Sequence, residues 1–593
     1  MTNIEISNIK SLIKKGKYIL ARKKIVGLIN NEPNNLSYKN LLAFIYVNQK
    51  KYKDSIIVLN NIIKQSPNSI DAYINLGSIY NDLNQLQKAE DYFKQAISIN
   101  SNHVLALNKL ADVYDRQSKH EEASGIYSRL ILNDPDNLEL LNDYSSNLIK
   151  LGNLNKAKKI LNEILNLNSK HIGAIINLGV VYKDEENLEK AIQYFLFALK
   201  LKPNLSIAYH NLGTVYEDRK QFGSAITHYK KAIKIKPTYA GAHYNLGCVL
   251  DKIGKTKDAI LSYKKTANYD PKHIKAQYNL GIDLLAIDDF KNGWKGYELR
   301  WGSDIKKHYE KLGIPKNKIW YGGKFNGSLI VHAEQGLGDE ILFSSMFPDL
   351  LNHHTSLFIS VSNRLISLFQ RSFSKIKFIR KNESFDLKKN SKHLLAGSLG
   401  KFFRNSINDF KKNKDSWLMP NKKKFEKFKK YFHDSKKIKV GLAWKSIGIE
   451  SEVRNISLND LARIFPKDNF EIINLQYGDI KSDKKILEKQ DDRKLICFDN
   501  LDYTNDFENL AALICNCDLI VTIGGFTASL AGSLGKQSWV LPPARSTWCW
   551  HSNSNRIESL WYPNMKFFRQ KSINEWRYVF DLIKTEVNLK YKL

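Results

Sequence analysis

A 34-residue period runs through the first half of the chain and constrains what this half can fold into. The dipeptide Leu-Gly recurs with its glycine at Gly77, Gly179, Gly213, Gly247 and Gly281, and Ala111 and Ser145 hold the two intervening slots. An alanine stands twelve residues after each slot from 77 to 247, and a large apolar residue stands sixteen after it. A fixed period of this length is typical of stacked structural repeats.

The residue types in the frame indicate paired antiparallel helices. Small residues let two helices approach closely, and the large residue fills the space beside them. Prolines at 135, 203, 237 and 271 fall where the second helix of a pair must end, because proline cannot donate to the helical ladder. The pattern resembles the tetratricopeptide repeat. It predicts about eight such repeats over residues 5–301, arranged as a superhelix.

An asparagine precedes Leu-Gly in five repeats, at Asn75, Asn177, Asn211, Asn245 and Asn279. An amide both donates and accepts, so a row of them can pair with an extended peptide backbone. The row resembles the amide ladder inside the repeats of O-linked N-acetylglucosamine transferases, which implies peptide binding. Local hydrogen bonds in an asparagine-rich chain are an equally good interpretation, and Lys109 and Asp143 interrupt the row.

The second half alternates apolar runs of strand length with helical segments. The runs cover residues 328–333, 356–361, 376–381, 438–444, 470–477, 494–498, 518–523 and 537–542. This alternation predicts parallel sheets in two Rossmann-like halves, residues 321–430 and 431–570, after a basic linker at 302–320 and before a final helix at 571–593. Open sheets of this class bind ligands at the carboxyl ends of their strands.

Two glycine turns follow such strands. In "VHAEQGLGDEILF" Gly336 and Gly338 precede Asp339, and in "DLIVTIGGFTASLAGSLGK" Gly524 and Gly525 precede a helical segment. The free N–H groups of a helix start can hold an anion, so the second turn is a candidate phosphate site. An acidic residue favoured by the helix dipole is the alternative interpretation of Asp339.

The motifs "HAEQGLGDEILF", "GLAWKS", "NLQYG", "SLAGSLGKQSWVLPP" and "LWYPNMKFFRQ" occur in this order. Together they resemble bacterial tetratricopeptide proteins with a C-terminal glycosyltransferase-like domain similar to heptosyltransferases. The resemblance implies a GT-B fold of two halves, an acceptor side and a nucleotide-sugar side. The layout of repeats followed by GT-B is also similar to that of O-linked N-acetylglucosamine transferase.

The resemblance implies roles for individual residues. Asp339 is the candidate general base, and Glu334 and Glu340 are neighbours that could replace it. The candidate donor-binding residues are Gly336, Gly338, Lys445, Ser446, Arg454, Gln476, Tyr477, Gly524, Gly525, Thr527 and Ser529. Lys445 as a solvated lysine and Tyr477 as a packing residue are the alternatives. Ser529 stands where the family usually has a histidine, and a hydroxyl lacks the charge of an imidazolium.

These observations predict a glycosyltransferase that moves a sugar (hexosyl or heptosyl) from a nucleotide-sugar to a protein or glycan, with the repeats recruiting the partner. A non-enzymatic scaffold with a degenerate transferase domain is the alternative. No permanently bound cofactor and no metal are expected, and the nucleotide-diphosphate sugar is a substrate.

Composition indicates the cellular compartment of the protein and argues against DNA as a partner. The net charge of +32 comes from lysines scattered among asparagines, so no DNA partner is expected. Five cysteines without a CxxC pair favour a reducing compartment. No secretory signal and no apolar run long enough to span a bilayer are evident. The expected location is cytoplasmic.

Overall fold

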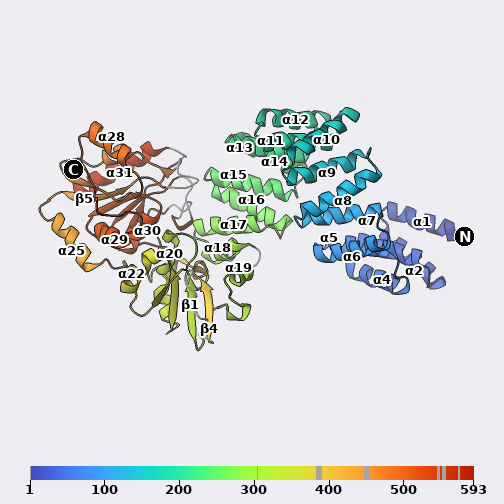
Figure 1. The fold of residues 1–593 in the computed structure, drawn as a ribbon, viewed down its shortest axis with the longest axis horizontal. Helices are drawn as coiled ribbons and strands as arrows, with labels where there is room; N and C mark the ends of the chain where they lie inside the picture. The colour runs from blue at the N-terminus through green and yellow to red at the C-terminus, as the bar shows by residue number, and fades with distance from the viewer. Residues whose placement is uncertain are drawn as a thin grey trace. The chain divides into compact units, whose positions relative to one another are not determined.

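The first half forms successive antiparallel helix pairs in the computed structural model, which describes residues 2–302, 305–354, 356–381, 390–413, 415–446, 454–543, 548–550, 556–571 and 575–593 (Figure 1). The helices are α1 (Thr2–Lys14), α2 (Tyr18–Asn31), α3 (Leu36–Asn48), α4 (Tyr52–Gln65), α5 (Ile70–Asp82), α6 (Leu86–Ile99), α7 (Val104–Arg116), α8 (His120–Asn133), α9 (Leu138–Lys150), α10 (Leu154–Leu167), α11 (Ile172–Asp184), α12 (Leu188–Leu201), α13 (Ser206–Asp218), α14 (Phe222–Ile235), α15 (Ala240–Lys252), α16 (Thr256–Tyr269), α17 (Ile274–Ala286) and α18 (Phe290–Tyr297). The predicted helical repeat array is therefore confirmed.

The glycines of three Leu-Gly pairs, Gly77, Gly179 and Gly247, are required because an aromatic ring lies against each of them. A Cβ atom at Gly77 would lie 2.6 Å from the ring of Phe93, and one at Gly179 would lie 2.5 Å from the ring of Phe195. Real Cβ atoms do not come this close to a ring carbon. The large residue sixteen positions later thus packs on the small residue of its own repeat.

The two helices of the last pair, α17 and α18, pack against each other differently from the helices of the earlier pairs. Here Gly281 faces backbone, because a Cβ atom on it would lie 2.6 Å from Gly296 Cα and 2.8 Å from Gly293 O. The two helices therefore touch backbone to backbone. Tyr297, which holds the ring position of the frame, instead packs edge-on against Trp294 and Trp548.

The chain divides into two compact units, residues 1–215 and 216–593. The boundary falls inside the repeats, so α14 to α18 belong to the same unit as both sheets. The sequence had suggested a division near residue 301, where the period ends.

The first sheet is parallel and has the order β3-β2-β1-β4. Its strands are β1 (Ser328–His332), β2 (Leu357–Val361), β3 (Lys377–Arg380) and β4 (Ser391–Leu395). Its other elements are η1 (Glu298–Trp301), α19 (Ile305–Lys311), η2 (Lys316–Lys318), α20 (Leu337–Ser344), α21 (Phe347–Leu351), α22 (Asn363–Ser372), η3 (Ala396–Ser398), α23 (Gly400–Phe403) and α24 (Ile407–Phe410). Strand β4 was not predicted, because the short run "SKHLL" begins with three polar residues.

The second sheet is parallel and has the order β10-β9-β8-β5-β6-β7. Its strands are β5 (Ile438–Ala443), β6 (Phe470–Asn474), β7 (Leu495–Ile496), β8 (Leu519–Ile523), β9 (Ser538–Leu541) and β10 (Met565–Phe567), of which β10 was not predicted. Around it lie α25 (Lys422–Tyr431), α27 (Leu458–Ala462), α28 (Lys481–Asp491), α29 (Phe507–Cys515), α30 (Phe526–Ser533), η4 (Trp548–Trp550) and α31 (Trp576–Tyr591). Helix α31 buries Val579, Ile583 and Val587 in one core cluster with residues of β5, β8 and β9.

The segment expected to be a linker, 302–320, is packed in its described part. Tyr309, Ile314 and Ile319 are buried together with Leu395 at the end of β4, and the Tyr309 hydroxyl accepts from Leu395 N–H at 2.8 Å. Ile319 also pairs with His393 as an isolated parallel bridge. These contacts join the segment to the first sheet.

Lysine is concentrated in one helix despite its general scatter. Helix α25 has six lysines among its ten residues and packs on the protein through Phe428. Among the described residues, no helix is long and apolar enough to cross a membrane.

Candidate functional site

Three of the predicted donor-binding stretches meet at one edge of the second sheet. Lys445 and Ser446 follow β5, Gln476 and Tyr477 follow β6, and Gly524 follows β8. The order β8-β5-β6 makes these strands neighbours, and all run in the same direction. Their following loops therefore lie side by side, as the sequence predicts for a ligand-binding edge.

Gln476 holds this edge together. Its side-chain oxygen accepts from the backbone N–H groups of Trp444 and Lys445 at 2.9 and 2.8 Å, and its amide nitrogen donates to the carbonyls of Lys445 and Tyr477, both at 3.0 Å. An amide has two N–H donors, so none is left for a ligand. Gln476 is a positioning residue for the loop after β5. Tyr477 is half-buried beside it.

Lys445 is paired with an acid. Its ammonium lies 2.6 Å from Asp483 on α28, which also accepts from the Trp444 indole at 3.2 Å. The lysine side chain is 37% exposed, so the pair is open to solvent and to an incoming anion. Ser446 N–H donates to Asn455 at 2.8 Å, which brings the segment that carries Arg454 against the same loop.

The opening of α30 presents an exposed glycine above buried hydroxyls. Gly525 is the N-cap residue and has open space where a Cβ atom would lie, whereas Gly524 packs under Trp550. Thr527 and Ser529 are buried. The N–H groups of the first helical turn have no acceptor within the helix, so they are available to an anion.

Helices α20 and α30 meet at their starts. A Cβ atom on Gly338 would lie 3.6 Å from Ser529 Oγ and 3.9 Å from Phe526 N. The backbone of α20 therefore fills the space into which a larger side chain at position 529 would extend. Serine at this position fits the packing of the two helices.

Asp339 lies one residue beyond this contact. Its carboxylate accepts from Gly336 N–H at 3.1 Å. Burial raises the pKa of Asp339 above its usual range, the Gly336 N–H bond opposes that rise, and the nearby Glu334 adds to it. A half-buried carboxylate with a raised pKa has the properties of a general base.

Glu334 and Glu340, the neighbours that could replace Asp339, are both bonded within the fold, and a role for either as the base stays a prediction. Glu334 accepts from the Arg300 guanidinium at 2.6 Å, from the Trp301 indole at 2.5 Å and from Gly397 N–H at 2.7 Å. Glu340 is buried, accepts from Ser362 N–H at 2.9 Å and lies 3.7 Å from the Lys381 ammonium. Both carboxylates thus accept hydrogen bonds and form ion pairs that hold neighbouring segments of the fold together.

The Arg300–Glu334 pair joins the last repeat to the first sheet, and the sequence did not reveal it. The side chains of Arg300 and Glu334 are only 2% and 4% exposed. Glu334 follows β1 and Gly397 follows β4, so the pair sits where these adjacent strands end. Arg300 lies at the end of the repeat region and Glu334 in the "HAEQG" motif. No sequence pattern connects these two segments, so the pair could be found only from the structure.

Two histidines of the first sheet face each other, His332 on β1 and His393 on β4, with Nε2 and Nδ1 2.9 Å apart. Burial lowers the pKa of each imidazole from 6.5 to about 4. The unfolded imidazoles therefore take up protons near pH 6.5, whereas the folded pair resists protonation until about pH 4.

The second unit is accordingly expected to lose about 3 kcal/mol of stability for each histidine, on the order of 6 kcal/mol for the pair, between pH 6.5 and 4. All ten tryptophans lie in residues 294–576, so tryptophan fluorescence during denaturation follows this unit alone. The variant His332→Gln/His393→Gln should lose less on acidification than His353→Gln, whose side chain is exposed. Equal losses in the two variants would contradict the assignment.

The asparagine row is half-buried, and several of its members are bonded within the repeats. Asn177 donates to the side chain of Asn142 at 2.9 Å, and Asn279 lies 3.5 Å from the Tyr263 hydroxyl. Asn211 pairs with the neighbouring His210 at 3.4 Å. Asn245 and Asn75 are half-buried in the same phase. These contacts favour local hydrogen bonding for the row, and peptide binding by it stays a prediction.

No group of three or more histidine, cysteine, aspartate or glutamate side chains suited to a metal occurs in the described ranges.

Four family models match the helical half. They are a tetratricopeptide repeat at 70–103, the cilia and flagella-associated protein 70 middle TPR-like domain at 107–219, a TPR repeat at 215–254, and a tetratricopeptide repeat at 240–273. This part of the chain is built of tetratricopeptide repeats. Such repeats are in general protein- or peptide-binding scaffolds.

The curated relatives match in part. Protein FlbA of Caulobacter vibrioides is 26% identical over 321 residues, which cover 49% of this chain and 51% of FlbA. The human protein O-mannosyl-transferases TMTC1 and TMTC3 are 29% and 28% identical, over 22% and 30% of this chain and 15% and 22% of theirs. The chain thus spans about half the length of FlbA and less of the other two.

Among solved structures, a tetratricopeptide repeat protein from Parabacteroides merdae covers 42% of this chain and 98% of its own at 19% identity, with a TM-score of 0.39. YrrB, described as a TPR protein with an unusual peptide-binding site, covers 31% of this chain and 95% of its own at 22% identity, with a TM-score of 0.24.

Proposed function

We propose that the protein is a glycosyltransferase of GT-B type that moves a sugar from a nucleotide-diphosphate donor to a protein or glycan acceptor. The strand order of the second sheet carries this proposal. Counted along the chain, β7-β6-β5-β8-β9-β10 reads 3-2-1-4-5-6, the order of dinucleotide-binding sheets. The crevice of such a sheet lies where the order reverses, here between β5 and β8.

The residues at that reversal suit a diphosphate. Lys445 and Ser446 lie directly after β5, and the exposed Gly525 opens α30 after β8. Helix N–H groups and the lysine ammonium would stabilise the negative charge that forms on the leaving diphosphate. The GT-B assignment also agrees with the other parallel sheet, the first sheet of the chain. The glycine turn that opens α20 after its strand β1 contacts α30.

Asp339 would supply the base. It takes the proton from the acceptor hydroxyl as the hydroxyl oxygen bonds to the anomeric carbon, and the bond from that carbon to the diphosphate breaks. The pair of electrons leaves with the nucleotide diphosphate. The matches to the O-mannosyl-transferases cover at most 22% of those proteins, so the proposal does not rest on them.

Nucleotide binding tests the donor site. Uridine, guanosine, adenosine and cytidine diphosphates, each titrated to millimolar concentration, should include one that raises the melting temperature and gives a saturable calorimetric isotherm. The decisive variant is Gly525→Asp. A Cβ atom at this position meets nothing within 4 Å, and aspartate is a favoured N-cap residue, so the helix should keep its stability.

The new carboxylate would repel the diphosphate, so Gly525→Asp should abolish binding by charge alone. Gly525→Asn is the matched control, because it has the same shape without the charge and should keep most of the affinity. The proposal fails if none of the four diphosphates binds the native protein, or if the two variants bind equally well.

A non-enzymatic scaffold is the second candidate function. Two observations favour it: the Lys445 ammonium already has the Asp483 carboxylate as a partner, and position 529 carries a hydroxyl without an ionisable group. This candidate predicts no nucleotide binding and an unchanged ability of the repeats to bind their partner.

A further inference from the structure

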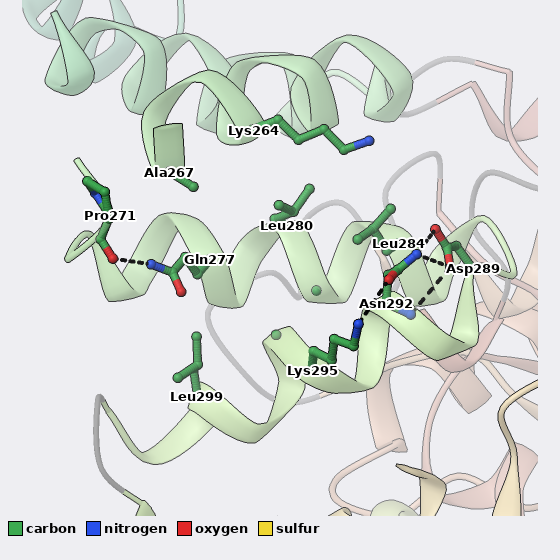
Figure 2. A pocket seen from close by; sticks show the side chains of 12 residues that line it. Lys264, Ala267, Pro271, Gln277, Leu280, Leu284, Asp289, Asn292, Lys295 and Leu299 are labelled. Atoms are coloured by element: carbon green, nitrogen blue, oxygen red, sulfur yellow. Dashed lines mark hydrogen bonds between the residues drawn. The ribbon is translucent and has the colours of Figure 1, made fainter. Parts of the chain in front are cut away.

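A pocket of about 570 Å³ opens between the last helices of the repeats, α16, α17 and α18. Its floor is apolar, and Figure 2 shows Leu280 and Leu284 on α17 between Ala267 on α16 and Leu299 beyond α18. Asn279 is not among its lining residues. The pocket is therefore separate from the asparagine row on the same helix.

A sequence exception at position 267 opens this pocket. The same position of the frame holds a branched apolar residue in all seven earlier repeats: Ile29, Ile63, Ile97, Ile131, Leu165, Leu199 and Ile233. Six of these side chains pack against the core clusters: Ile29, Ile63, Ile97, Ile131, Leu165 and Ile233. Only the last repeat boundary has alanine, which leaves the space of a large side chain.

A second exception lies across the pocket. Gly296 occupies a position held by Tyr92, Ile126, Ile160, Tyr194, His228 and Ser262 in the preceding repeats. Its backbone lies against that of Gly281, and a Cβ atom on Gly296 would lie 2.6 Å from Gly281 Cα, so this position offers no side chain. Leu280 is only partly buried here, whereas Leu76, Leu178 and Leu212 at the same position of the frame are fully buried.

The rim of the pocket is basic. Lys264 on α16 and Lys295 on α18 are exposed and lie on opposite sides of α17 (Figure 2). Neither ammonium has an ion-pair partner in the described part of the chain, and Lys295 only approaches the Asn292 side chain at 3.5 Å. The one acid of the rim, Asp289, accepts from Asn292 N–H at 3.4 Å and from its side chain.

We propose that this pocket is a docking site for an acidic peptide segment of a partner protein, with a large apolar side chain as its anchor. The apolar floor would bury the anchor, and Lys264 and Lys295 would pair with carboxylates on either side of it. The proposal deepens the partner recruitment of the proposed function. It names the chemistry of the partner and places its recognition in the last repeat.

A displayed library of random dodecapeptides, selected on the intact protein, provides the probe. Recovered peptides should share a leucine, isoleucine, phenylalanine or tryptophan flanked by aspartate or glutamate, and their affinity should fall with added salt. Ala267→Ile restores the residue type that every earlier repeat carries, so it should fold normally. It should weaken the recovered peptides about tenfold or more by filling the anchor space.

Lys264→Glu/Lys295→Glu should weaken the same peptides by about tenfold or more. The control with the same charge change is Lys230→Glu/Lys257→Glu, at exposed positions of α14 and α16 outside the pocket, and it should leave affinity within about twofold. The proposal is overturned if no acidic motif is recovered, or if Ala267→Ile binds the peptides as well as the native protein.

Self-association of the native chain that Ala267→Ile abolishes, seen by sedimentation, would identify a second copy as the occupant and would also overturn the proposal. None of these readouts uses a nucleotide. Loss of peptide binding with intact diphosphate binding therefore separates a failure here from a failure of the proposed transferase.

Discussion

Arg300→Met is expected to destabilise the second unit by about 3–5 kcal/mol, the usual cost of leaving one member of a buried ion pair alone. Glu334 would keep only the Trp301 indole and Gly397 N–H as partners for a carboxylate that is 4% exposed. Tryptophan fluorescence during urea denaturation measures the effect in this unit only, because residues 1–215 contain no tryptophan. The midpoint should fall while the repeats of the first unit keep their helical signal.

Two further variants make the result specific. Adding Glu334→Gln to Arg300→Met should recover a large part of the loss, since it removes the unpaired charge. Lys316→Met breaks the exposed pair with Glu310, whose side chains are 62% and 49% exposed, and should cost less than about 1 kcal/mol. If Arg300→Met costs no more than Lys316→Met, the buried pair does not stabilise the junction.

Asp339→Asn is expected to lower sugar transfer or donor hydrolysis by about 10²–10⁴-fold, because the amide cannot accept the acceptor's proton. Nucleotide diphosphate affinity should stay within about threefold of native, since Asp339 acts on the acceptor. The measurement is release of nucleotide diphosphate from a panel of nucleotide-sugars. Burial raises the pKa of Asp339, so activity should fall with acid at a higher pH than for an ordinary aspartate.

Asp434→Asn is the matched control, because Asp434 is a fully exposed carboxylate in the loop before β5. It should leave turnover unchanged. A native enzyme that is active and an Asp339→Asn variant that retains full turnover would exclude Asp339 as the base, while leaving the donor site to be judged by Gly525→Asp.

Period and pattern were sufficient for most of the fold. The 34-residue frame located the helix pairs because each small residue is followed sixteen positions later by a large apolar one, which packs on it in pairs such as Gly77 and Phe93. Eight strands were found because each lies in a mainly apolar run of strand length. Strands β2 and β8 are buried along their whole length, as expected of strands inside parallel sheets, whereas β3 is not. Strand β4 escaped because "SKHLL" is short and polar at its start, and its hydrogen bonds come from β1 rather than from any local signal.

The candidate site was predicted less well, for physical reasons. The order of strands and helices in the sequence predicted which strand ends lie together. It did not predict which hydrogen-bond partners the side chains at those ends have. Gln476 was predicted to contact the ligand. In the structure its side-chain amide is instead fully hydrogen-bonded to the backbone of Trp444, Lys445 and Tyr477. The commitment of Glu334 depends on Arg300, 34 residues away across a repeat boundary, and no local pattern encodes that contact.

The unit boundary at residue 215 has a consequence for how such a protein can change. Repeats before it can be gained, lost or exchanged as cassettes while Arg300, α17, α18 and both sheets keep their contacts. A chimera joined near residue 215 should therefore keep the second unit folded, with α14 to α18 and both sheets, while its earlier repeats come from another protein. One joined near 301, where the period ends, would cut through the folded unit and separate Trp294 from its partner Arg404.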